Sequence, residues 1–375
     1  MKLHRQAGGA PAPNMTSRTF TPGQRAAIYV LVTFALTWTV EFGVIWPVAA
    51  SSSGPLSGYG MNGMSVLVYG LIAGMMLMPT VGMLLTRLIT REGMHDAWVK
   101  PLAFRCTWKW WVAAWLGTIA LVAIGSAAYF AIFPGDFDPT MSTMAASIMQ
   151  AAQAQGLSIS EDQAHAALYG QLALLFVVPF ANVVTAFGEE WGWRGYLMPK
   201  LMERFSAIPA LLIMGVIWGL WHLPLTMLGH NYGTGYAGYP FLGIVAMCWM
   251  CCCVGVFLSW LTLKTGTCIP AAIAHGFFNG CASAGVLFSA TGGNALVGPA
   301  AVGVLGSIGF AVVAAAMLVA LRRRQRAGLP LSPRSAFTHP SSGVPCQAKT
   351  ASSARPVATS KPQPLAAHPN ESEPS

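Results

Sequence analysis

Long apolar stretches separated by short polar segments dominate the pattern of this chain. Eight of these stretches reach the roughly 20 apolar residues that a helix needs to span a bilayer. They lie at about 26–48, 65–88, 110–133, 166–190, 207–227, 240–263, 268–290 and 295–321. The pattern therefore predicts an all-α protein, a polytopic membrane helix bundle with about eight transmembrane helices.

The composition agrees with a lipid bilayer as the solvent. Charged residues make up 9% of the 375 residues, whereas a soluble globular protein carries about 25%. Hydrophobic residues make up 54%. These values exclude a disordered protein, an ordinary soluble enzyme and a basic domain that binds nucleic acid. We expect the lipid bilayer, and no nucleic acid, as a partner.

The positions of the 21 basic residues indicate the topology and account for the net charge of +9. Cytoplasmic loops of membrane proteins carry the excess of Lys and Arg. With a cytoplasmic N-terminus, all 21 basic residues fall on the cytoplasmic side of the predicted spans. We therefore expect a multi-pass integral membrane protein with both termini cytoplasmic, in a bacterial plasma membrane.

Polar segments flank the predicted bundle at both ends. Residues 1–25 are basic and lack the apolar core of a signal peptide, so we interpret them as a cytosolic N-terminal segment. Residues 26–321 form the predicted membrane bundle. Residues 322–375 are rich in Pro, Ser and Ala, which predicts a disordered cytosolic tail.

Ionisable side chains within the predicted spans are few, and such groups are costly in a membrane and tend to be functional. The densest cluster is Glu189, Glu190 and Arg194 at the end of the fourth span. Glu190 and Arg194 can pair as i and i+4 on a helix. Glu189 is rotated from Glu190 by about 100° and can face a different neighbour. The alternative is a juxtamembrane anchor, for which two adjacent carboxylates are expensive.

Two later spans each carry a histidine with a partner on the same helix face. Trp218 and His222 are four residues apart in the fifth span, and Pro224 frees backbone groups there, which suits a cavity. His275 and Asn279 share a face of the seventh span. The alternative for both pairs is a hydrogen bond between helices that only holds the bundle together.

Taken together, one carboxylate, two histidines and an asparagine form a hydrolytic set. A carboxylate such as Glu189 can serve as general base for a water molecule. Histidine and asparagine donors can stabilise a developing oxyanion. The same groups could instead bind a divalent metal, because histidine and carboxylate suit zinc. The metal ligands would then be Glu189, His222 and His275.

Three ordered motifs on separate predicted spans resemble those of a known family. They are Glu189-Glu190-x-x-x-Arg194, Trp218-x-x-x-His222 and His275-x-x-x-Asn279. The set resembles the CAAX prenyl protease family and, more broadly, the bacterial CPBP (Abi) intramembrane proteases. The resemblance covers residues 180–285, and we expect the catalytic core at about 165–290. Trp218 stands where the family motif usually has Phe, a mild aromatic exchange.

The resemblance implies a CAAX-type membrane endopeptidase of the glutamate type that acts without a cofactor, with zinc as the alternative. Its substrate would be a peptide or protein in the membrane. By position, the resemblance implies that Glu189 activates the water molecule beside His222. His275 and Asn279 would form the oxyanion site. Supporting residues would be Glu190, Arg194 and Trp218.

Two other classes of function remain open alternatives. The first is a non-catalytic membrane partner, such as a bacteriocin-immunity protein of the Abi type. The second is a transporter that uses Glu189 as a proton site. An inverted repeat in the sequence would support a transporter, and none is visible. Rival intramembrane proteases are excluded more firmly, because the chain has no His-Glu-x-x-His motif and no aspartate within a predicted span.

Some polar or reactive residues have no assigned role. Glu41 lies within the first predicted span. His165 and His230 lie near predicted outer edges and are weaker candidates for the site. The sixth span carries four cysteines, which we interpret as small packing residues in preference to metal ligands: Cys248, Cys251, Cys252 and Cys253.

Overall fold

The structure is a computed structural model that describes residues 20–51, 63–94, 96–102 and 104–334. Its first half contains α1 (Pro22–Val40), η1 (Glu41–Ile45), α2 (Trp46–Ser51), α3 (Gly63–Met75), α4 (Met78–Thr90), α5 (Phe104–Val112), η2 (Ala113–Gly117), α6 (Thr118–Ile132), η3 (Pro134–Asp136), α7 (Ser142–Ala154) and α8 (Glu161–Leu174). Its second half contains α9 (Pro179–Gly192), η4 (Trp193–Leu197), α10 (Met198–Arg204), α11 (Ala207–Trp221), α12 (Leu223–Met227), α13 (Phe241–Thr265), α14 (Ile269–Cys281), η5 (Ala284–Phe288) and α15 (Ile308–Arg326). Within the described ranges every regular element is helical, so the all-α prediction is confirmed.

Among the residues that the structure describes, five helices are long and apolar enough to cross a membrane. They are Pro22–Ala49, Gly70–Thr90, Phe104–Ile132, Phe241–Thr265 and Ile269–Phe288. A sixth is obtained if α8 and the helix Pro179–Arg204, which bend by 46° at their junction, count as one span. The polytopic bundle is therefore confirmed, but the expected count of eight is not.

Two expected spans differ from the structure for physical reasons. The stretch 207–227 breaks at His222, and α11 ends after 15 residues because Pro224 interrupts the helix. The stretch 295–321 begins with turns, and α15 starts only at Ile308 and ends in arginines. By length and composition, α11 is too short to pass as a span, and α15 carries too many charges.

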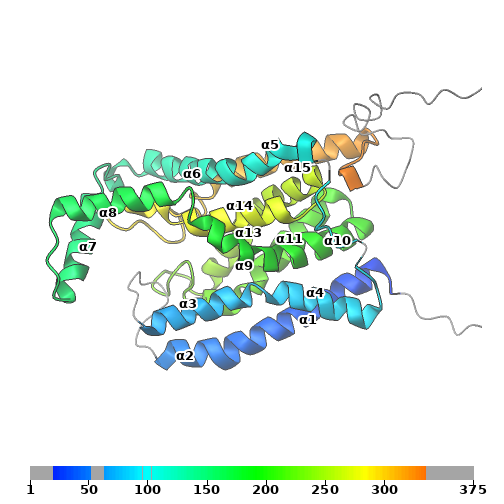
Figure 1. Ribbon diagram of the computed structural model, residues 1–375, viewed down its shortest axis with the longest axis horizontal. Coiled ribbons are helices and arrows are strands. Elements are labelled where there is room, and N and C mark those ends of the chain that lie inside the picture. The colour runs from blue at the N-terminus through cyan, green and yellow to red at the C-terminus, as the bar shows by residue number, and fades with distance from the viewer. Residues whose placement is uncertain (1–19, 52–62, 95, 103, 335–375) are drawn as a thin grey trace, which may run out of the picture.

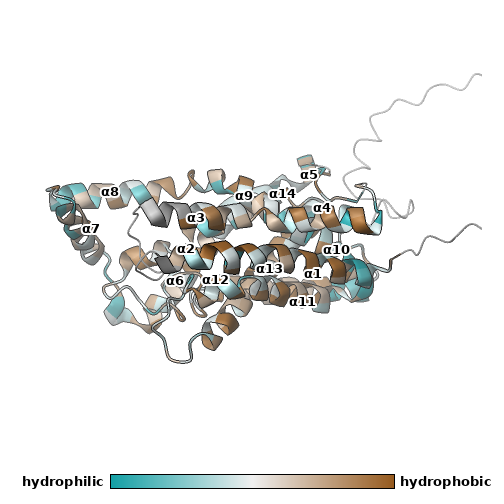
Figure 2. Ribbon diagram, turned by 90° about the horizontal axis from the view of Figure 1, so that it is seen from below, coloured by the Kyte–Doolittle hydropathy of each residue, from teal (hydrophilic) through white to brown (hydrophobic). Residues whose placement is uncertain are grey.

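The helices pack in layers that place α13 and α14 at the centre. Figure 1 shows α1, α2, α3 and α4 on one side, α5, α6 and α15 on the other, and α9 and α11 between them with α13 and α14. Apolar residues run along the helices, as the hydropathy colours of Figure 2 show, and polar residues gather at their ends. Leu88 and Val184 keep more than 70% of their surface exposed, as expected for side chains that face lipid.

A close crossing of α11 and α13 uses small residues on both helices. A Cβ atom added to Gly219 would lie 2.6 Å from the Cα of Cys248, and one added to Gly215 would lie 2.7 Å from the Cα of Cys252. Small residues four apart let two membrane helices approach this closely. Both cysteines therefore occupy a helix-packing surface, as the sequence predicted.

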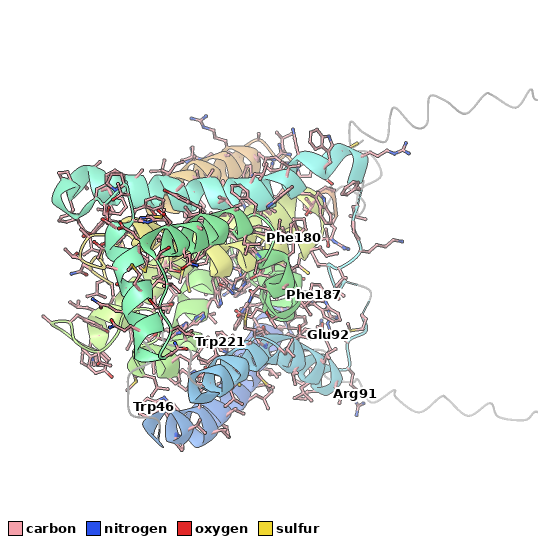
Figure 3. The ribbon with its side chains drawn as sticks, turned by 60° about the vertical axis from the view of Figure 1, so that its left-hand side comes forward. Trp46, Arg91, Glu92, Phe180, Phe187 and Trp221 are labelled. Atoms are coloured by element: carbon pink, nitrogen blue, oxygen red, sulfur yellow. The ribbon has the colours of Figure 1, made fainter. Side chains whose placement is uncertain are left out.

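Basic and acidic side chains form an ion network at one end of the bundle (Figure 3, beside Arg91 and Glu92). Glu92 lies 3.2 Å from both Arg25 and Lys200, measured between N and O atoms. Asp96 lies 2.8 Å from Arg87 and 3.3 Å from Lys200. The network joins the ends of α1, α4 and α10, so their basic residues lie on one side, as the predicted topology requires. Which side of the membrane this is stays a prediction.

Both acidic members of the network hold their charge more strongly than usual. Burial opposes the charge of Glu92, but the hydrogen bond from Tyr196 and the charge of Lys200 outweigh burial and lower its pKa. Burial likewise opposes the charge of Asp96, and the hydrogen bond and charge of Arg87 outweigh burial and lower its pKa. The network therefore contributes to stability only while these carboxylates are ionised.

The beginning of the expected C-terminal tail is ordered. Helix α15 continues to Arg326, and the Arg334 side chain donates from Nε to the carbonyl of Gly266 at 2.6 Å. Residues 335–375, the rest of the expected disordered tail, lie outside the described residues, as do residues 1–19 of the N-terminal segment.

Candidate active site

The two adjacent glutamates lie near the end of α9, where the helix passes directly into the π-helix η4. π-Helical turns are frequent at functional sites. Glu189 is 2% exposed, and its Oε2 accepts hydrogen bonds from Trp218 Nε1 at 2.9 Å and Trp193 Nε1 at 3.3 Å. Its Oε1 accepts no hydrogen bond from a described residue. Two indole donors therefore hold one oxygen, and the other is available to a water molecule.

Glu190 points to different partners, as the sequence predicted for adjacent helix positions. Its Oε1 accepts from Arg194 at 2.7 Å and from His275 Nδ1 at 2.9 Å. Arg194 is fully buried, and its guanidinium carbon lies 4.5 Å from the centre of the Trp218 ring. Glu190 thereby connects α9, η4 and α14 in one buried contact.

Both histidines of the motifs have one ring nitrogen fixed by a neighbour. His222 lies at the break between α11 and α12 with φ −80° and ψ 1°, a backbone region in which active-site residues often occur. Its Nδ1 lies 2.8 Å from the carbonyl oxygen of Trp218 and must donate, because a carbonyl oxygen only accepts. In neutral His222 the Nε2 atom is therefore the acceptor. His275 likewise uses Nδ1 toward Glu190, which leaves its Nε2 for another partner.

A cavity of about 360 Å³ collects most of the predicted site residues. Its lining includes Glu189, Trp218, His222, His275 and Asn279. The two remaining predicted residues do not line the cavity. Glu190 and Arg194 lie behind its wall and hold it through the contacts described above.

A second, mainly apolar cavity of about 760 Å³ adjoins the first. Both cavities share Ala73, Asn182 and Asn279 as lining residues. The other residues that line the second cavity come mostly from the end of α8, the bend before Pro179 and the first turns of α9. The polar cavity thus opens toward an apolar space at the bent pair of helices.

Three further polar residues line the polar cavity, and the sequence singled out only one of them, His230, as a weaker candidate. Asn182 accepts a hydrogen bond from Asn279 Nδ2 at 3.1 Å and so orients that amide. It lies seven residues, two helical turns, before Glu189, a spacing that could have revealed it. His230 and Asn231 enter the cavity from the turn after α12. His230 was ranked as a weak candidate because it lies near a predicted outer edge.

The predicted zinc ligands do not gather into a metal site. Among the residues that the structure describes, no three His, Cys, Asp or Glu side chains are arranged so that they could hold a metal ion. Glu189, His222 and His275 line one cavity but do not form such a group.

Glu41 is fully buried beside the wall of the site. One turn before it, Thr37 accepts a hydrogen bond from Trp221 Nε1 at 2.9 Å, and five residues after it, Trp46 donates to the carbonyl of Pro224 at 3.1 Å. Figure 3 shows Trp221 next to the N-terminal helices. Neither oxygen of Glu41 has a hydrogen-bond partner among the described residues. Glu41 therefore belongs to the surroundings of the site, and nothing assigns it a role in the chemistry.

The fold and the cavity define a polytopic helical membrane protein with a buried carboxylate, histidine and amide site. Residues 171–281 match the family model of the type II CAAX prenyl endopeptidase Rce1-like proteins. The matched region contains all three motifs, so the resemblance inferred from them is confirmed over these residues.

One relative is a CAAX prenyl protease 2 from Methanococcus maripaludis. It is 33% identical over 107 residues, which are 27% of this chain and 37% of the relative. The matched region therefore spans well under half of the relative's length.

Proposed function

We infer that this protein is an intramembrane endopeptidase in which Glu189 activates water to hydrolyse a peptide bond. One observation carries the proposal. Glu189 lies in a cavity with one oxygen fixed by two indole donors and the other unengaged, and two histidines and an asparagine line the same cavity. The family match and the name of the relative agree with this class of reaction.

In the proposed reaction Glu189 Oε1 takes a proton from water, and the acceptor Nε2 of His222 orients that water. The water oxygen attacks the scissile carbonyl and becomes part of the new carboxylate. The proton taken by Glu189 passes to the leaving amine as the C–N bond breaks. The two indole donors stabilise the carboxylate form of Glu189 before the attack.

The oxyanion that forms on the carbonyl oxygen needs donors. Asn279 uses Nδ2 toward Asn182, which fixes the amide plane, and the second hydrogen on Nδ2 remains for the oxyanion. His275 donates from Nδ1 to Glu190 and, when its ring carries both protons, presents Nε2–H as a second donor. Glu190 and Arg194 act as positioning residues in this scheme.

The adjoining apolar cavity supports entry of the substrate from the membrane. It lies beside the bent pair of helices and meets the polar cavity at Asn182 and Asn279. We propose that it receives the apolar part of a lipid-modified peptide. The names of the family and of the relative suggest an isoprenyl group on a C-terminal CAAX sequence as this part.

Cleavage of an internally quenched, S-farnesylated CAAX peptide in proteoliposomes tests the proposal. Glu189→Gln should lower the turnover number by about 10²- to 10⁴-fold, because loss of a general base costs about that much. Glu203→Gln is the matched control, since the Glu203 side chain is half exposed and its ion pair with Lys200 is long, at 4.0 Å. His222→Ala and Asn279→Ala should also lose activity, whereas a non-catalytic partner would tolerate both.

Two outcomes would overturn the proposed function. One is cleavage by Glu189→Gln at the rate of the Glu203→Gln control. The other is the absence of cleavage by the wild-type protein on every peptide offered. A chelator added to the wild-type protein should leave the rate unchanged, and loss of activity that zinc restores would contradict the metal-free mechanism.

A further inference from the structure

A tight turn after α12 brings two polar side chains into the catalytic cavity. Gly229 (φ 91°), Asn231 (φ 69°) and Gly233 (φ 68°) adopt left-handed backbone conformations. The amide of Gly233 donates to the carbonyl of Gly229 at 2.8 Å, and the amide of His230 donates to the carbonyl of Leu225 at 3.0 Å. The backbone of the turn is thus closed on itself and on α12.

Tyr232 anchors this turn to another residue of the cavity wall. Its side chain is 3% exposed, and its hydroxyl donates to the carbonyl of Val302 at 3.0 Å. Val302 itself lines the cavity. These contacts fix the backbone of the turn at His230 and Asn231. Preorganised groups bind a ligand at a smaller cost in ordering than groups on a loose loop.

The side chains of His230 and Asn231 have no partner of their own within the described part of the chain. Both line the polar cavity, and neither ring nor amide makes a side-chain hydrogen bond there. His230 lies within electrostatic range of His222. Each side chain can both donate and accept hydrogen bonds, as a peptide group also does.

The chemistry of the cavity selects a neutral ligand. Its lining contains Glu189 and three histidines but no Lys or Arg among the described residues. A carboxylate would lack a strong counter-ion in this position, and a cation would have Glu189 alone. A main-chain amide offers one donor and one acceptor and so matches a pair such as His230 and Asn231.

We propose that His230 and Asn231 form a specificity subsite that binds a main-chain amide of the substrate on the leaving-group side of the scissile bond. The apolar cavity meets the polar one at Asn182 and Asn279, on α9 and α14. His230 and Asn231 enter from the α11–α12 side, where the apolar cavity has no lining residue. A chain whose lipid-bearing residue lies in the apolar cavity therefore extends its released segment toward them. This inference rests on the proposed endopeptidase function.

Peptides with one backbone atom changed test the subsite. The probes are two S-farnesylated quenched peptides that differ only in an ester in place of an amide after the scissile bond. The variants are His230→Ala and Asn231→Gly, because glycine keeps the left-handed conformation that Asn231 adopts. His165→Ala is the control, since His165 lies on α8 and does not line the cavity.

The variants should lower kcat/KM for the amide peptide by about tenfold, mainly through KM, since one hydrogen bond is worth about that factor. On the ester peptide the loss should shrink to less than about twofold, and His230→Gln should restore part of the activity. Amidation of the peptide C-terminus should leave the effect of both variants unchanged. A merely structural role would lower kcat on both peptides alike.

Three results would overturn the subsite. They are equal losses on the amide and ester peptides, no loss on either, and a loss confined to peptides with a free C-terminal carboxylate. If the wild-type protein cleaves the peptides and Glu189→Gln does not, these results overturn the subsite alone. If the wild-type protein cleaves none of them, the proposed function fails and the subsite fails with it.

Discussion

Replacing Glu190 by glutamine tests whether its ion pair holds the site together. The side chains of Glu190 and Arg194 are both 0% exposed, and their N and O atoms lie 2.7 Å apart. Glutamine keeps the shape and an acceptor for His275 Nδ1 but removes the charge, so Arg194 stays buried beside a neutral group. Removing one partner of a buried ion pair costs about 3–5 kcal/mol. The folding equilibrium constant should therefore fall by more than about a hundredfold.

The assay is equilibrium unfolding in detergent micelles, followed by tryptophan fluorescence. Glu203→Gln should change the free energy of unfolding by less than about 0.5 kcal/mol, because its ion pair is exposed and long. The double variant Glu190→Gln/Arg194→Met should recover most of the loss, because it leaves no buried charge. The reasoning is refuted if Glu190→Gln loses no more than the control, or if the double variant is as unstable as the single one.

Gly219→Ala should destabilise the protein by about 1–3 kcal/mol, because the new Cβ would lie 2.6 Å from the Cα of Cys248; Gly70→Ala, with no atom within 4 Å, should not destabilise it. Asp96 has a lowered pKa, so its contribution to stability is complete at neutral pH and disappears as the pH falls below about 4. Asp96→Asn should therefore lower the melting temperature at pH 7 and flatten its decline in acid. Glu41→Leu should raise the free energy of unfolding by about 1–3 kcal/mol, since it removes a buried carboxyl without described partners. A free energy of unfolding below that of the wild-type protein would show that the Glu41 carboxyl has a stabilising partner.

The residues of the three motifs could be predicted from the sequence because charge is expensive in a membrane. Few ionisable groups occur within the apolar stretches, so Glu189 and Glu190 stand out without any structure. Their different directions follow from helix geometry, and the observed partners, Trp218 for one and Arg194 for the other, agree with it. The charged part of the site could therefore be predicted from the sequence, because buried charges in a membrane are rare.

The neutral part of the cavity could not be predicted in the same way. Asn182 and Asn231 carry no charge, so their burial is not costly enough to distinguish them from polar residues elsewhere. His230 depends on a left-handed turn and on the anchoring of Tyr232 by Val302, which are tertiary contacts. The expected count of eight spans is not confirmed either, because apolar length alone does not show the break at His222.

The central claim is that Glu189 activates a water molecule that attacks the peptide bond directly. A single turnover in water enriched in oxygen-18, followed by mass spectrometry of product and protein, tests it. The account predicts one heavy oxygen in the new carboxylate of the product and none in the Glu189 side chain. A heavy oxygen on Glu189 would show that this residue attacked the substrate covalently, and would contradict the account.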